Sequence, residues 1–132
     1  MNKRIEITFL LLVLTQALHS TEEYFGRLWE VFLPAEFVSK AVSNNPEKGF
    51  IIINFGLVIF GLWCWLFPIR KNYSFASVFI WFWMIIEMVN GIVHPLVALY
   101  RRGYFPGVAT APVLFVLAVY LLRQLLYSGS KK

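Results

Sequence analysis

The residues best suited to chemistry form one short motif, His19-Ser20-Thr21-Glu22-Glu23. On a helix, residues three and four apart share a face, so the His19 imidazole would stand beside both carboxylates, Glu22 at i+3 and Glu23 at i+4. The motif therefore gathers a neutral base and two acids within about one turn. This combination suits metal binding or acid–base catalysis.

A second polar motif lies inside a long apolar segment. Glu87, Asn90 and His94 are spaced by three and then four residues among Phe, Trp, Ile, Met and Val, so a helix would carry them on one stripe. A charge at the centre of an inserted helix costs roughly 2.5 to 3.5 kcal/mol, and intramembrane carboxylates are functional candidates by default. Glu87 is therefore a candidate functional residue. His94 shares the stripe of Glu87 and Asn90, which favours a functional role for this histidine over simple helix packing.

The composition indicates a membrane protein. Of the 132 residues, 59% are hydrophobic and only 14% are charged, and the mean hydropathy is +0.67, whereas a soluble domain has about 25% charged residues. All seven acids are Glu, and the net charge of +5 comes mainly from basic pairs that flank apolar runs. Such pairs are typical membrane-end anchors and do not form the basic face of a nucleic-acid-binding protein. They are Lys3/Arg4, Arg70/Lys71, Arg101/Arg102 and Lys131/Lys132.

Four apolar stretches must position the two motifs: 5–17, 50–67, 75–99 and 108–127. A spanning helix needs about 20 mainly apolar residues, so the last three qualify, and the first qualifies only if it continues through His19 and the two glutamates. We expect Pro68 to close the second. The sequence predicts an all-α, polytopic membrane bundle of about four transmembrane helices in one domain, residues 1–132. A short interfacial helix is possible at 35–42 in the first loop.

The topology brings the two motifs to a similar depth. The first and third helices run in the same direction, with His19 fourteen residues past Ile5 and the pair Glu87 and Asn90 twelve to fifteen past Phe75. At 1.5 Å per residue each lies about 18 to 23 Å from its starting face. We therefore expect the stripes to face one another.

The third loop adds polar groups at the rim of this expected site. Pro106 and Gly107 form a rigid turn, and Tyr104 and Thr110 could direct hydroxyls toward the pocket. The adjacent basic pair at 101 and 102 could bind an anionic headgroup, although a role as interface anchors is the favoured reading.

Several alternatives remain open from the sequence. The first stretch could be a secretory signal peptide ending near Ala17, and its helix could end at Leu18, leaving the glutamates in a solvated loop. Asn54 in the second stretch is more often interhelical glue than a ligand. Cys64 is the single cysteine and forms no internal disulfide.

Three motifs in order resemble the HXXEE-domain family of small integral membrane proteins. They are His19-x-x-Glu22-Glu23, Asn90-x-x-x-His94 and Tyr104-x-Pro106-Gly107-Val108. The resemblance covers nearly the whole chain and implies that these residues are the family's motif positions. It supplies no reaction, since the family's function is uncharacterised and its enzymatic nature is only suspected from these residues.

The leading hypothesis is an integral membrane enzyme, metal-dependent and acting on a lipid or another hydrophobic substrate. Zinc, iron or manganese would suit ligands chosen from His19, Glu22, Glu23, Glu87 and His94. The expected catalytic residues are Glu22, Glu23, Glu87, Asn90 and Tyr104.

Two rival functions use the same cluster, namely a metal-free acid–base isomerase and a transporter of protons or divalent cations. An assembly factor would not need deep carboxylates. The basic residues, six on the side of the termini and five on the other, slightly favour cytoplasmic termini.

Overall fold

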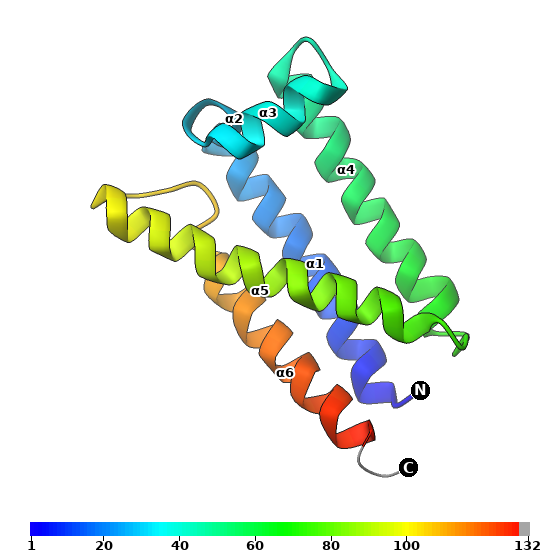
Figure 1. The fold of residues 1–132 in the computed structure, drawn as a ribbon. Helices are drawn as coiled ribbons and strands as arrows, with labels where there is room; N and C mark the ends of the chain where they lie inside the picture. Colours follow the sequence, from blue (N-terminus) through cyan, green and yellow to red (C-terminus); the bar gives the residue numbers. More distant parts are fainter. Residues whose placement is uncertain (130–132) are drawn as a thin grey trace.

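The protein is a bundle of four long helices (Figure 1). The computed structural model describes residues 1–129, and all of their regular structure is helical. The N-terminus and the end of the last described helix lie at one end of the bundle, and two short helices cover the other end (Figure 1). The predicted all-α helical bundle is confirmed, while the expected anchors Lys131 and Lys132 lie outside the described residues. The elements are α1 (Lys3–Phe25), α2 (Leu28–Val31), α3 (Leu33–Val42), α4 (Pro46–Cys64), the π-helix η1 (Trp65–Ile69), α5 (Ala76–Arg101) and α6 (Ala111–Gly129).

Three helices among the described residues are long and apolar enough to cross a membrane. They are α4 continued by η1 (Pro46–Ile69), α5 and the Ala111–Ser128 part of α6. This finding supports a membrane protein. The predicted span from the first stretch is not among them, because Gln16, His19 and the two glutamates dilute its apolar character.

Helix α1 runs without a break through the His19 motif. The Asn2 side chain caps its start by accepting a hydrogen bond from the backbone of Arg4, and the helix ends at Phe25. The alternative in which the helix stops at Leu18 is therefore wrong. Polar side chains at i, i+3 and i+7, namely Gln16, His19 and Glu23, are all buried on one face of α1.

Prolines set several helix boundaries differently from the sequence prediction. The α4 helix begins at Pro46 behind the cap of Asn45, four residues before the predicted start. Pro68 does not close the helix at position 67 but lies within η1. A proline lacks an amide hydrogen and crowds the carbonyl four residues earlier, and a wider π-helical turn relieves that clash. The α6 helix begins at residue 111 rather than 108, because residues 106–110 form turns.

Two apolar clusters fill the bundle above and below the polar residues. The larger cluster joins α1, α5 and α6 through side chains such as Phe9, Trp83 and Leu114, all fully buried. The smaller one joins Leu28 and Trp29 to Phe50 and Phe105 near the end covered by α2 and α3. The polar side chains of α1 and α5 are thus held between two rigid apolar layers.

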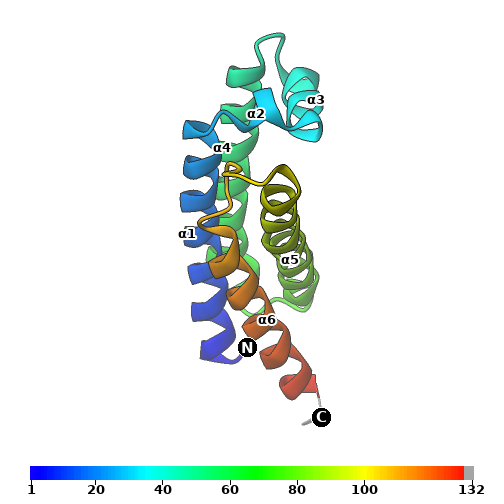
Figure 2. The ribbon, with the colours of Figure 1, turned by 90° about the vertical axis from the view of Figure 1, so that its left-hand side faces the viewer.

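The connection between α5 and α6 returns into the bundle. Residues 102–110 cross from the end of α5 toward α1 before α6 begins (Figure 2). Three consecutive residues of this segment are buried, Phe105, Pro106 and Gly107. Irregular backbone at membrane depth is tolerated only where the protein satisfies its polar groups, so the partners of this segment are central to the site.

Candidate metal centre

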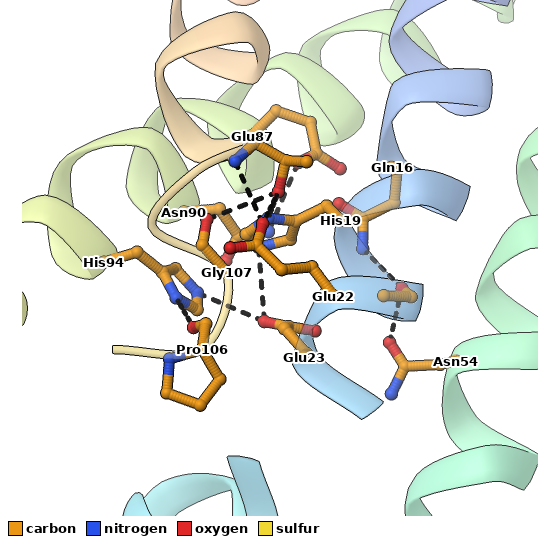
Figure 3. A network of polar contacts seen from close by, with 12 residues as sticks. Gln16, His19, Glu22, Glu23, Asn54, Glu87, Asn90, His94, Pro106 and Gly107 are labelled. Atoms are coloured by element: carbon orange, nitrogen blue, oxygen red, sulfur yellow. Dashed lines mark hydrogen bonds and ion pairs between the residues drawn. The ribbon is translucent and has the colours of Figure 1, made fainter. Parts of the chain in front are cut away.

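Three buried side chains from α1 and α5 converge beneath the 102–110 connection (Figure 3). His19 Nε2 and His94 Nε2 each lie 3.2 Å from Glu23 Oε1, and the two imidazole rings meet edge-on with centroids 4.6 Å apart. One ligand atom from each residue lies within 4.8 Å of the others. This cluster of His19, Glu23 and His94 could hold a metal ion.

The partners of the opposite ring nitrogens fix the tautomers of both histidines. His94 Nδ1 lies 2.7 Å from the carbonyl oxygen of Pro106, which can only accept, so Nδ1 carries the proton. His19 Nδ1 lies 2.7 Å from Thr110 Oγ1, whose own hydroxyl proton is donated to the Glu22 carboxylate. His19 Nδ1 is therefore also a donor, so Nε2 is the atom of each imidazole that is turned toward Glu23.

Two imidazole nitrogens and one carboxylate oxygen thus converge in a buried site. His19 Nε2 is fully buried, and Glu23 Oε1 is the polar atom that faces it, at 3.2 Å. A single divalent cation between these three atoms would contact all of them at once. With bonds of about 2.0 to 2.1 Å, the corners of a tetrahedral zinc site are about 3.3 Å apart, close to the 3.2 Å nitrogen–oxygen separations. The donor set therefore fits a divalent metal.

Glu22 faces away from this cluster and holds the returning connection. Its Oε1 accepts hydrogen bonds from Tyr104 Oη (3.0 Å) and the backbone N–H of Ala109 (2.9 Å). Its Oε2 accepts from the backbone N–H of Thr110 (3.0 Å) and from the Thr110 hydroxyl. A carboxylate is favoured at a helix N-terminus, and here it satisfies the backbone just before α6. Glu22 is thus one of the predicted ligands that the structure does not bring into the cluster.

Tyr104 takes part in the same set of hydrogen bonds between Glu22 and the 102–110 connection, which we call the clamp. Its ring is 65% exposed and its hydroxyl donates to Glu22, so it lies outside the converging trio. Partial burial of the hydroxyl, together with the hydrogen bond to the Glu22 carboxylate, raises the pKa of the Tyr104 phenol above its ordinary value.

Gly107 allows the connection to pass directly against both imidazoles. Its φ is +93°, a conformation that side chains rarely adopt, and a Cβ atom there would lie 2.6 Å from His94 Nδ1 and 2.7 Å from His19 Cε1. Glycine is the residue that meets both demands. The sequence pointed to Gly107 through the expected turn and the family motif, and the close approach to both imidazoles supplies the physical reason for a glycine here.

Glu87 lies beside the cluster rather than in it. It is fully buried, accepts a hydrogen bond from Asn90 Nδ2 (3.2 Å) and lies 2.9 Å from the side-chain amide nitrogen of Gln16 when that amide is oriented to suit its partners. The predicted stripes of α1 and α5 do face each other, with His19 opposite His94 and Gln16 opposite Glu87. Sequence reasoning missed Gln16, although its spacing of three before His19 could have revealed it.

The remaining polar candidates make structural contacts. The Ser20 hydroxyl donates to Asn54 Oδ1 at 2.7 Å, which links α1 to α4 as expected of interhelical glue. Arg101 donates to the carbonyl of Val31, and its guanidinium lies over the Phe105 ring, 5.3 Å from the centroid. Arg101 therefore ties the end of α5 to the end of α2.

The fold and the cluster together define a class: a small helical membrane protein with a buried His, Glu and His cluster closed by a returning connection. Residues 10–121 match the family described as "protein of unknown function with HXXEE motif", and the chain belongs to this family. The motif name corresponds to His19, Glu22 and Glu23. Comparison with curated proteins and with solved structures gives no match.

Proposed function

We propose that the protein is an integral membrane enzyme whose metal ion is held by His19, Glu23 and His94, and which acts on a lipid or another hydrophobic substrate. The observation that carries this proposal is the convergence of two imidazole Nε2 atoms on one carboxylate oxygen in a buried site. Zinc, iron and manganese all accept nitrogen and oxygen ligands of this kind. Three protein ligands leave a coordination position free, which is typical of catalytic sites.

The surrounding residues have defined tasks in this proposal. Pro106 and Thr110 fix the ring orientation of the histidines, a role that partners of metal-ligating histidines commonly have. Asn90 and Glu87, hydrogen-bonded to each other, are the polar groups available to orient a substrate or move a proton. When bound, the metal would supply Lewis-acid activation of water or substrate.

We also propose that α1 is a fourth membrane span. Its 23 residues measure about 34 Å, which is enough for a hydrocarbon core of about 30 Å. Its buried polar face is turned toward α5 and the connection, away from lipid. Four spans agree with the start of α1 and the end of α6 lying at one end of the bundle (Figure 1), and we keep cytoplasmic termini as the proposed orientation.

The rival functions remain distinguishable. A metal-free isomerase is the nearest one, because His19 and Glu23 at 3.2 Å could also exchange a proton. A transporter is less favoured, since the fully buried apolar side chains of Phe9, Leu12 and Trp83 fill the bundle toward the termini and offer no polar path.

Metal analysis of the purified full-length protein tests the proposal. We expect about one tightly held divalent metal per chain, and its loss in Glu23→Gln. Glu87→Gln is the matched control, because this equally conservative change at another buried carboxylate should leave the metal content unchanged. Absence of bound metal from protein that is active, or equal metal loss in both variants, would refute the proposed ligand set.

A further inference from the structure

A cavity of about 260 Å³ reaches the candidate metal centre from the side. It lies beneath α3 and between α4 and α5, which meet near the 70–75 connection and separate toward α3 (Figure 1). Side chains from all of α1 to α5 line it, including two of the three cluster residues, Glu23 and His94.

The cavity is polar at one end and apolar along its walls. Glu23, His94 and Asn90 form the polar end at the cluster, Ser39 and Asn54 add two neutral polar groups, and the apolar lining includes Leu28, Phe32, Val38 and Ile53. A site with these two parts fits a ligand that has a polar group joined to a hydrocarbon chain.

Exposure shows that the cluster opens on this side. The exposed fraction of the side chain is 8% for Glu23 and 4% for His94, but 0% for His19. His19 is covered by Gly107 of the connection, whereas both partly exposed residues line the cavity. A substrate must therefore approach the cluster from the cavity.

We infer that the substrate is a single-chain amphiphile, whose hydrocarbon chain lies in this cavity and whose polar end reaches Glu23, His94 and Asn90. The inference rests on the proposed function. The number of hydrocarbon chains is argued from the cavity volume. At about 260 Å³ the cavity is smaller than most ligand pockets, which measure roughly 300 to 1,000 Å³, so it suits one chain rather than two. The chain leaves between α4 and α5 into the bilayer.

A second apolar groove supplies an internal reference. It has a volume of about 530 Å³, lies between α1 and α4, and is lined by residues such as Ala17, Phe55 and Val58 without any member of the cluster. Bulk lipid is expected to contact this groove whatever occupies the cavity.

Photolabelling in liposomes tests the inference. The full-length protein is reconstituted in phosphatidylcholine vesicles with either of two probes, a long-chain alcohol with a diazirine in its chain or a diacyl phosphatidylcholine with the same diazirine, and labelled peptides are mapped by mass spectrometry. We expect the single-chain probe to label the cavity wall around Phe32, Val38 and Ile53, and the diacyl probe to label chiefly the groove at Phe55 and Val58. Equal labelling of the cavity by both probes would overturn the single-chain assignment, and labelling of the groove alone by both would overturn the site.

Variants that fill the cavity complete the test. Overpacking opposes occupation by about 1 to 3 kcal/mol, so Ile53→Trp should lower labelling of the cavity about tenfold. Ile52→Trp, on the same helix but 56% exposed, should not. Ala35→Leu serves as a second filling variant should Ile53→Trp fail to fold. Metal content is measured on the same samples: normal metal with unchanged cavity labelling refutes only the chain site, whereas absent metal in the unaltered protein refutes the metal centre.

Discussion

Replacing Glu22 with Gln should loosen the 102–110 connection without removing a metal ligand. Glutamine keeps the size of the side chain but lacks the charge, and it places an NH₂ group where one oxygen now accepts hydrogen bonds. The Thr110 backbone and hydroxyl both donate to Oε2 in a partly buried setting. The Tyr104 and Ala109 donors are exposed to solvent, so water can replace their acceptor.

The expected destabilisation follows from these contacts. Hydrogen bonds to a charged group contribute about 1.5 to 3 kcal/mol and neutral ones about 0.5 to 1.5, so each of the two bonds from Thr110 weakens by about 1 kcal/mol. Loss of a negative charge at the start of α6 adds about 0.3 to 1 kcal/mol. The sum is about 2 to 3 kcal/mol of local stability, which corresponds to an opening equilibrium about 30- to 150-fold more favourable.

Amide hydrogen exchange of the Ala109 and Thr110 backbone measures this opening directly. In Glu22→Gln we expect exchange at these two amides to accelerate about 30- to 150-fold, with metal affinity reduced about 10- to 100-fold through loss of support for His19 and His94. Amides in the middle of α4 should be unaffected and serve as the control. Unchanged exchange at Ala109 and Thr110, combined with complete metal loss, would refute the reasoning and make Glu22 a ligand.

Three other changes test the same geometry. Gly107→Ala should lower metal affinity more than tenfold and reduce the midpoint of thermal unfolding, because the added Cβ atom would clash with both imidazoles. Gly103→Ala is the control: a Cβ atom at this position meets no other atom, so neither quantity should change. Thr110→Val should weaken metal binding about 10- to 100-fold, because it removes the hydroxyl that accepts a hydrogen bond from His19 Nδ1. Thr110→Ser keeps a hydroxyl and should bind metal normally. Equal metal binding by the two variants would contradict the tautomer assigned to His19. The folded-state pKa of Tyr104 is raised, so the stability that its hydrogen bond to Glu22 contributes is complete below about pH 10, the ordinary pKa of tyrosine, and is lost as pH rises through the higher folded pKa. A tyrosinate absorbance titration, compared with that of Tyr104→Phe, should show one tyrosine that ionises above its ordinary pKa. A Tyr104 that ionises at or below the ordinary value would contradict this prediction.

The sequence by itself determined the membrane character and the helices. The chain has few charges and long apolar runs, and such runs must be buried in lipid or inside a helical bundle, where helices satisfy their own backbone hydrogen bonds. Helical spacing placed His19 with Glu23 on one face, and Glu87 with His94 on another. Local rules failed at Pro68, because a π-helical turn accommodates a proline that would end an α-helix.

Only the tertiary structure decided which polar residues act together. Glu22 and Glu23 are adjacent in sequence, but a helical step of 100° per residue sends them to different partners: Glu23 to the two histidines and Glu22 to the connection before α6. That division depends on backbone groups of Pro106, Ala109 and Thr110, whose positions no side-chain pattern records. The sequence therefore supplied the candidate ligands, and the long-range packing of the returning connection against α1 and α5 selected among them.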